Sequence, residues 1–219
     1  MTSEQRLMVD RAGEFSAAEA EQLYDDGARA AAGYLGGYTL SPWSRDGFAV
    51  SVRQFGGVLP IWVMHPQTQT QRLGMQEGVE TVKAMAELWR PHAGRLVCLD
   101  VESGYDHGRP TDRAVIAWRN VVRSHGYRGG LYGGRATIEM VTGLTITACD
   151  ETGGWQMVWL ADWPVHRLDP HLRLDEMPTR WVKMAGHRAW QYAGDVDLGG
   201  VVVDLSLVDC ALNPMPLAK

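Results

Sequence analysis

Two carboxylates, Asp100 and Glu102, stand at the end of an apolar run with the sequence RLVCLDVESG, residues 95–104. If residues 96–99 form a strand, successive side chains alternate faces, so Asp100 and Glu102 share one face. Their Cβ atoms would then lie about 6.5 Å apart, at a rise of ~3.3 Å per residue. Paired carboxylates after a buried strand are typical of catalytic groups in α/β proteins. The alternative is that both are solvated charges held by backbone amides or by an arginine.

The whole chain has the composition of a globular protein. It has 219 residues, of which 45% are apolar, and a net charge of −5. No block of Lys and Arg stands out, so we expect no nucleic-acid partner. The three cysteines form no C-x-x-C motif, so we expect no disulfide framework, no metal site and no cofactor. No apolar run has the length of a signal-peptide core or a membrane span, which predicts synthesis in a reducing cytoplasm.

Apolar periodicity and turn residues divide the chain into alternating strands and helices. The predicted strands are 6–10, 34–38, 58–65, 96–100, 129–134 and 155–163, and the predicted helices are 16–32, 46–55, 74–90, 110–126 and 136–141. Ser16 and Glu19 have the spacing of a capping box, and Asp46 is expected to cap the second helix. In the third helix the spacing predicts this buried stripe: Met75, Val79, Val82, Met85, Ala86 and Trp89.

The last two predicted strands, 189–192 and 201–205, are joined only by AGDVDLGG. This connection is too short for a parallel crossover, so the two strands should be antiparallel neighbours. Five strand–helix units followed by three strands predict an α/β fold, a single TIM-like barrel domain over residues 1–219. The carboxyl ends of its parallel strands would meet at one mouth. That mouth would gather Asp10, His65, Asp100, Glu102, Tyr132 and Asp162.

The ordered set of motifs resembles glycoside hydrolase family 25, whose muramidases have a barrel of five β/α units followed by three strands. The matching stretches are LDVES (99–103), WLADW (159–163), WQY (190–192) and VVVDLSLVD (201–209). The family's acids would then fall at Asp10, Asp100, Glu102 and Asp204. YLGGY (34–38) and GMQEGVETVKAMAEL (74–88) resemble a sister group, the actinobacterial glycoside-hydrolase-like domain of uncertain activity. Asp10 and Asp162 depart from the sequence context usual in muramidases.

The resemblance implies a hydrolase that cuts glycan strands of peptidoglycan. Glu102, nearer the mouth, is expected to be the general acid, with its pKa raised by the carboxylates of Asp100 and Asp10. Asp100 should stay ionised, and the resemblance implies that it orients the N-acetyl group of the substrate. Asp10 and Asp204 would tune the charge of the site or, alternatively, tie the barrel backbone together. The expected substrate contacts are His65, Tyr132, Asp162, Trp190 and Tyr105.

Two functions of different classes remain open. The first is a peptidoglycan hydrolase, either a phage lysin or a tail-associated wall enzyme, with virion or lysis proteins as further partners. Lacking a signal peptide, it would be made in the cytoplasm and reach the wall after release or within a virion. The second is a non-catalytic barrel that serves as a wall-binding or virion structural module. Release of reducing ends from purified cell walls distinguishes them.

Overall fold

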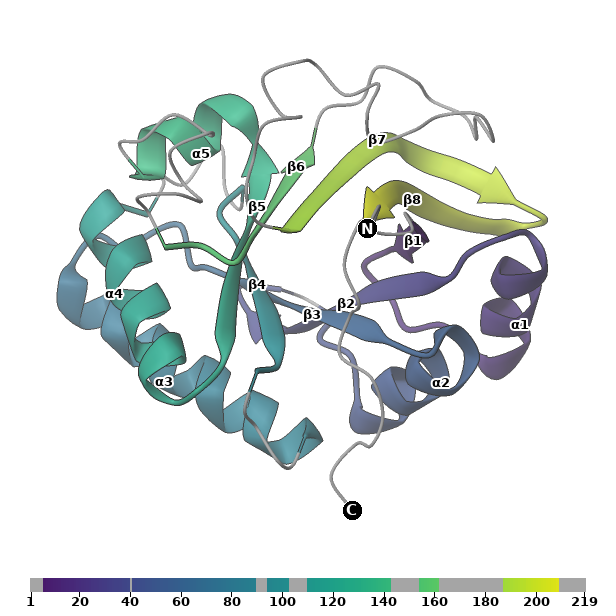
Figure 1. Cartoon of the computed structure of the whole chain (residues 1–219), viewed down its shortest axis with the longest axis horizontal. Coiled ribbons are helices and arrows are strands. Elements are labelled where there is room, and N and C mark those ends of the chain that lie inside the picture. The colour runs from purple at the N-terminus through teal and green to yellow at the C-terminus, as the bar shows by residue number, and fades with distance from the viewer. Residues whose placement is uncertain are drawn as a thin grey trace.

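The computed structural model describes residues 6–39, 41–89, 94–102, 110–142, 154–161 and 187–208. Within these ranges, eight strands pair in sequence order into a closed barrel, and helices surround it (Figure 1). The strands are β1 (Arg6–Asp10), β2 (Ala30–Gly37), β3 (Val58–Val63), β4 (Leu96–Asp100), β5 (Arg128–Gly134), β6 (Met157–Ala161), β7 (His187–Leu198) and β8 (Val201–Val208). The helices are α1 (Ala17–Asp25), α2 (Arg45–Phe55), α3 (Gln71–Leu88), α4 (Asp112–Ser124) and α5 (Arg135–Thr142).

The strand directions confirm the predicted α/β barrel of five β/α units followed by three strands. Pairing is parallel from β1 through to β7. β8 is antiparallel to both of its neighbours, β7 and β1, as the short connection before it predicts. The carboxyl ends of the parallel strands therefore open at one mouth.

The barrel interior is filled by side chains from alternate strand positions. Its buried members are Met8, Ala30, Ala32, Leu59, Ile61, Val63, Leu96, Cys98, Tyr132, Met157, Trp159, Ala189 and Val208. Small residues make room for large ones: a Cβ added to Gly130 would lie 3.0 Å from Cys98 Sγ and 3.2 Å from Met157 Cβ. Cys98 thus fills the barrel below Asp100. Because these side chains fill the interior, the carboxylates that could do chemistry lie at the mouth.

The first helix is shorter than predicted. Ser16 and Glu19 form the predicted capping box, but α1 ends at Asp25 instead of near residue 32. The chain turns there, and the alanines that follow belong to β2, which begins at Ala30 and pairs with β1. Alanine is the best helix former, so the local sequence favours helix here. Pairing with β1 and the need for small interior side chains override that preference.

The buried face of α3 also differs from the predicted stripe. Met75 and Val79 are 46% and 40% exposed. Met85 and Trp89 are buried as predicted, but the other buried residues are Gly74, Gly78, Thr81 and Leu88. A Cβ added to Gly74 would lie 2.1 Å from the carbonyl oxygen of Ala114 on α4. The glycines therefore let α3 and α4 approach closely, and a pattern of large apolar residues does not reveal such a contact.

Two further boundaries differ from the prediction. Ser44, and not Asp46, caps α2, because its hydroxyl accepts a backbone N–H of the first turn at 3.2 Å. Most of the predicted loop 193–200 belongs to β7. Only Gly199 and Gly200 turn the chain, with φ of 61° and 95°, and such positive values suit a tight two-residue hairpin.

β7 and β8 form a ribbon that extends beyond the barrel. β6 pairs with β7 as far as Gln191, and β1 pairs with β8 from Asp204 onward. The outer part of the ribbon reaches toward α1 (Figure 1). There Gln22 Nε2 donates to the carbonyl oxygen of Leu198 at 3.2 Å. The ribbon is therefore anchored at both of its ends.

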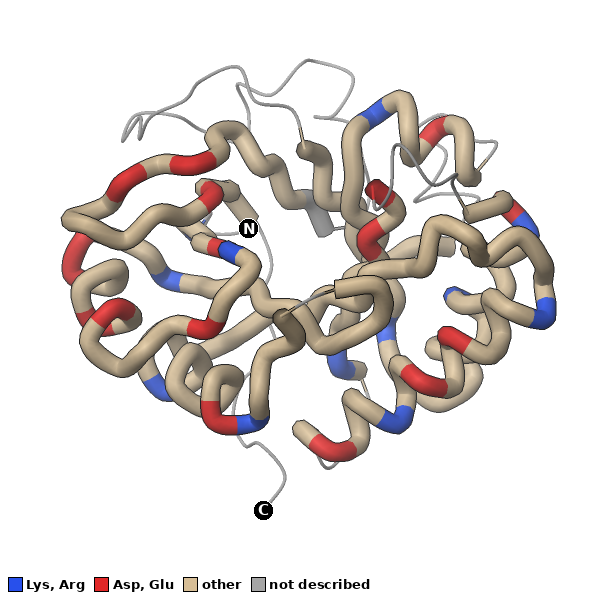
Figure 2. Tube along the Cα trace, turned by 180° about the vertical axis from the view of Figure 1, so that it is seen from behind, with Lys and Arg blue, Asp and Glu red and all other residues tan. Residues whose placement is uncertain are grey.

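Apart from buried acids such as Asp10 and Asp100, the charged residues are spread along the described chain. In the view of Figure 2, Lys and Arg are scattered around the rim and do not gather on one face. No helix of the described ranges is long and apolar enough to cross a membrane.

Candidate active site

β4 delivers the carboxylate pair to the mouth of the barrel. Asp100, its last residue, is 7% exposed, and Glu102 is half-buried just beyond it. Asp100 Oδ1 accepts the backbone N–H of Glu102 at 2.8 Å, and Glu102 Oε1 accepts the backbone N–H of Gly134. A Cβ added to Gly133 would lie 3.1 Å from Glu102 Cγ. Because Gly133 has no side chain, the end of β5 leaves room for the side chain of Glu102. The two acids therefore share one site.

A second pair of acids lies across the barrel. Asp10 and Asp204 are direct partners in the pairing of β1 with β8. Gln191 Nε2 donates to Oδ2 of each, at 3.3 Å in both cases. Gln191 Oε1 accepts from the Tyr132 hydroxyl at 2.9 Å, and this hydroxyl also lies within hydrogen-bond reach of Glu102. One network therefore joins the acids of β1 and β8 to the acid that follows β4.

Burial, more than charge, sets the protonation of the central pair. Burial together with the charge of Glu102 raises the pKa of Asp100 to about 7. Burial also raises the pKa of Glu102, while hydrogen bonds from Gly134 and Tyr132 oppose the shift. With this pKa, Asp100 is only partly ionised near neutral pH in the free protein, and not fully ionised as expected. Burial therefore raises the pKa of Glu102, and not the charges of Asp100 and Asp10 as the sequence predicts.

The pKa values of the second pair, Asp10 and Asp204, are also raised. Burial, followed by the charge of Asp204, raises the pKa of Asp10 well above its ordinary value. Burial and the charge of Asp195 raise the pKa of Asp204. Asp10 Oδ1 accepts no hydrogen bond from the described residues. An unpartnered buried oxygen is much less costly on a neutral carboxyl than on a carboxylate, so we infer that Asp10 is protonated in the free protein.

Two residues of the site were missed from the sequence. Tyr34 of β2 lies among the four acids: burial raises its pKa, and the charges of Asp10, Asp100, Asp204 and Glu102 raise it further. The alternation that leads from Ala30 through Ala32 to Tyr34 was hidden by the predicted helix over 16–32. Gln191 stands inside the WQY motif, and the alternation of strand faces could have placed it opposite the two aromatic residues.

The predicted substrate contacts do not all lie at the mouth. Tyr132 does, but His65 lies in a separate pocket with Tyr38. Trp190 is 3% exposed and packs in the outer core, with its ring centroid 5.9 Å from that of Tyr192. A sugar cannot stack on an indole buried in this way. Tyr105 and Asp162 lie outside the described residues.

Comparison with known proteins identifies the fold. No family model and no curated protein sequence matches the chain. Among solved structures, an uncharacterised protein of B. stearothermophilus is similar with a TM-score of 0.72 and 17% identity, covering 93% of this chain and 96% of that one. A family 25 glycosyl hydrolase from Bacillus anthracis has a TM-score of 0.61 and 12% identity, covering 94% and 89%. The catalytic domain of endolysin ply40, from bacteriophage P40 of Listeria monocytogenes, has a TM-score of 0.56 and 12% identity, covering 96% and 95%. The chain therefore has the barrel fold of the family 25 glycosyl hydrolases and endolysins.

Proposed function

We propose that this protein is a muramidase-type hydrolase of peptidoglycan glycan strands. The observation that carries the proposal is the pair at the mouth of a closed barrel, buried Asp100 and half-buried Glu102, whose pKa values are both raised. The second acid pair and its glutamine bridge add to it, because simple strand-end solvation requires no such network. Similarity to a family 25 glycosyl hydrolase and to an endolysin catalytic domain supports the bacterial wall as the substrate.

Glu102 is the general acid of the proposed reaction. Glycoside cleavage needs a proton for the leaving oxygen and a negative group near the anomeric carbon. Glu102 is the more exposed of the pair, and its raised pKa lets it keep a proton at a higher pH than an ordinary glutamate does. After donating the proton, its carboxylate is stabilised by the N–H of Gly134 and the hydroxyl of Tyr132. The carboxylate then takes a proton from the attacking water.

Asp100 supplies the negative group. Its carboxylate orients the N-acetyl group of the substrate, whose carbonyl oxygen attacks the anomeric carbon. The positive charge that develops there favours the ionised form of Asp100, which lowers the pKa of about 7 that burial produces in the free protein. Across the barrel from this pair, Gln191 holds Asp10 and Asp204 in place through its side-chain hydrogen bonds.

We further propose that the enzyme serves a phage, either as a lysin or as a tail-associated wall enzyme. It would be made in the host cytoplasm and reach peptidoglycan after release or as part of a virion, where virion or lysis proteins are its partners. Similarity to the catalytic domain of a bacteriophage endolysin supports this role. Lysis of host cells from outside by the purified protein, and its detection in purified virions, test the two routes.

The catalytic proposal is tested with two substrates. Wild-type protein should clear purified walls and release reducing ends. Glu102→Gln keeps the shape of the side chain but removes the transferable proton, so wall cleavage should fall by about 10²–10⁴-fold. An aryl glycoside with a good leaving group needs little protonation and should be affected much less. Asp100→Asn should slow both substrates alike.

Asp25→Asn serves as the control, because it removes an exposed carboxylate at the end of α1. If Glu102→Gln slows both substrates equally, the acid is assigned to the wrong residue. If wild-type protein releases no reducing ends, the barrel is a non-catalytic wall-binding or virion structural module.

A further inference from the structure

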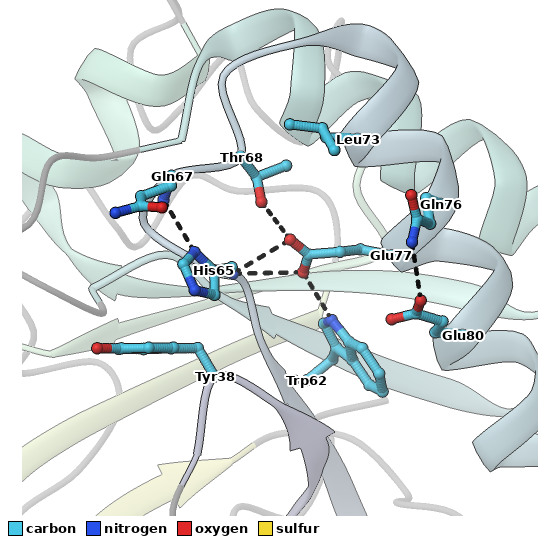
Figure 3. Close-up of a pocket in the computed structure, with 10 residues that line it drawn as sticks. Tyr38, Trp62, His65, Gln67, Thr68, Leu73, Gln76, Glu77 and Glu80 are labelled. Carbon is cyan, nitrogen blue, oxygen red and sulfur yellow. Dashed lines mark hydrogen bonds between the residues drawn. The ribbon is translucent and has the colours of Figure 1, made fainter.

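A second pocket lies beside the barrel, between the ends of β2 and β3 and the first turns of α3 (Figure 3). Its volume is about 440 Å³, which falls in the range of small-ligand sites, ~300–1,000 Å³. The side chains that matter here are Tyr38, Trp62, His65, Gln67, Gln76 and Glu80. Its lining includes none of the four acids of the mouth, so it is a separate site.

The paired glycines of the YLGGY stretch shape one wall of this pocket. Gly37 has a φ of 87°, and a Cβ there would lie 2.0 Å from the carbonyl oxygen of Val63. A Cβ on Gly36 would lie 2.9 Å from the indole ring of Trp62. Because both side chains are absent, the end of β2 lies directly against this indole. The two glycines thus allow the close approach of β2 to β3 that forms this wall of the pocket.

Glu77 fixes the opposite wall. Its carboxylate accepts from Trp62 Nε1 at 3.0 Å, from the His65 backbone N–H at 3.2 Å and from the Thr68 hydroxyl (Figure 3). These bonds hold the β3–α3 loop and the indole in one arrangement without a ligand. A ligand that enters therefore meets a preorganised surface, which lowers the entropic cost of binding.

The groups that remain available suit a polyhydroxylated ligand. Tyr38 is 44% exposed, and its ring centroid lies 4.6 Å from that of His65. His65 Nδ1 accepts the Gln67 N–H at 3.1 Å, so in the neutral ring Nε2 carries the hydrogen and can donate. Gln76 donates to Glu80 at 3.3 Å, which leaves further amide and carboxylate oxygens as acceptors. Donors and acceptors thus stand beside aromatic surface.

Charge narrows the choice of ligand. The lining has no Lys or Arg, which disfavours phosphate or carboxylate ligands. A cation would require an uncommitted buried carboxylate, but the oxygens of Glu77 already accept several hydrogen bonds. We propose that this pocket binds an uncharged sugar residue of a glycan, at a site distinct from the catalytic mouth. The inference rests on the proposed function for its biological meaning, but binding is measured without catalysis.

The test uses the full chain carrying Glu102→Gln, so that a glycan probe is not cleaved. Chitotriose, an uncharged N-acetylglucosamine trimer, is titrated while backbone amide signals are followed by NMR. We expect shifts at residues 37–38 and 65–68. Adding Tyr38→Ala should weaken binding at this site at least about fivefold, through loss of one aromatic face. Tyr38→Trp, which keeps such a face, should bind within about twofold of the parent.

A pair of helix glutamates provides a matched control. Glu80→Ala should weaken binding, whereas Glu21→Ala, an equally exposed site on α1, should leave it unchanged. Shifts confined to residues 100–102 and 132–134 would place the sugar in the mouth alone and overturn the proposal. So would shifts at 37–38 and 65–68 with tetramethylammonium but not with chitotriose, or no shift at about 10 mM probe. Wall cleavage by wild-type protein is scored separately, so either proposal can fail alone.

Discussion

Asp100→Asn should stabilise the folded protein increasingly as pH rises. Asp100 has a pKa of about 7 in the fold, against an ordinary value of 3.8, chiefly because of burial. The unfolded chain releases this proton near pH 4, whereas the folded chain keeps it until about pH 7. The stability that protonated Asp100 contributes is therefore complete below pH 4 and is lost as pH rises through 7.

The size of the effect follows from the shift. About three pKa units at 1.36 kcal/mol each correspond to roughly 4 kcal/mol of unfolding free energy. Asparagine has the same shape, and its oxygen can still accept the Glu102 N–H that now lies 2.8 Å from Asp100 Oδ1. The substitution thus removes the charge without opening a cavity. We expect the variant to be about 2–4 kcal/mol more stable than wild type at pH 8 and equal to it at pH 4.

Urea denaturation followed by tryptophan fluorescence at pH 4, 6 and 8 measures this difference. Asp25→Asn, which removes an exposed carboxylate, should show no such growth with pH. A constant difference between Asp100→Asn and wild type, or one that shrinks as pH rises, would refute the burial argument. Loss of wall cleavage in the more stable variant would show that the fold tolerates a costly charge for the sake of activity.

Three further outcomes are expected. Gln191→Leu removes the hydrogen bonds to Asp10, Asp204 and Tyr132, so it should lower the free energy of unfolding by about 2–4 kcal/mol and slow wall clearing at least about tenfold. Unchanged stability would argue against the network. Gly74→Ala should cost about 1–3 kcal/mol because its Cβ meets the Ala114 carbonyl, whereas Met75→Ala should cost under about 0.5; the opposite order in denaturation would restore the predicted α3 face. EDTA should leave wall clearing unchanged, since no group of three or more metal-ligating side chains is found in the described ranges; loss of clearing that one divalent ion reverses would show otherwise.

Local patterns carried the prediction of the barrel. The spacing of apolar residues within each segment indicates whether it is a strand or a helix. The short connection before β8 permits only an antiparallel neighbour. The same reasoning places Asp100 and Glu102 together, because two residues of spacing on a strand end suffice. Asp10 and Asp204 could be placed only through the closed barrel and the resemblance to a family.

Other features depend on neighbours that are distant in sequence. The helix preference of the alanines hid the start of β2, and with it the alternation that carries Tyr34 to the site, because pairing with β1 makes residues 30–32 a strand. The face of α3 that packs on α4 contains Gly74 and Gly78, which allow close contact because they have no side chain. The protonation of Asp100 follows from burial, which no spacing of charges reports. The contact of Tyr38 with His65 likewise arises from the pairing of β2 with β3.

The position of β8 has a consequence for the synthesis of this protein. β1 is the first of the eight barrel strands to leave the ribosome, yet its antiparallel partner β8 follows almost two hundred residues later, with Asp10 facing Asp204. Until then the barrel stays open, and neither Gln191 nor Asp204 can complete the acid network. A nascent or prematurely terminated chain that ends before β8 therefore lacks part of the proposed catalytic apparatus. Under the proposed function, this dependence on the late strand would keep incomplete translation products from cleaving glycans.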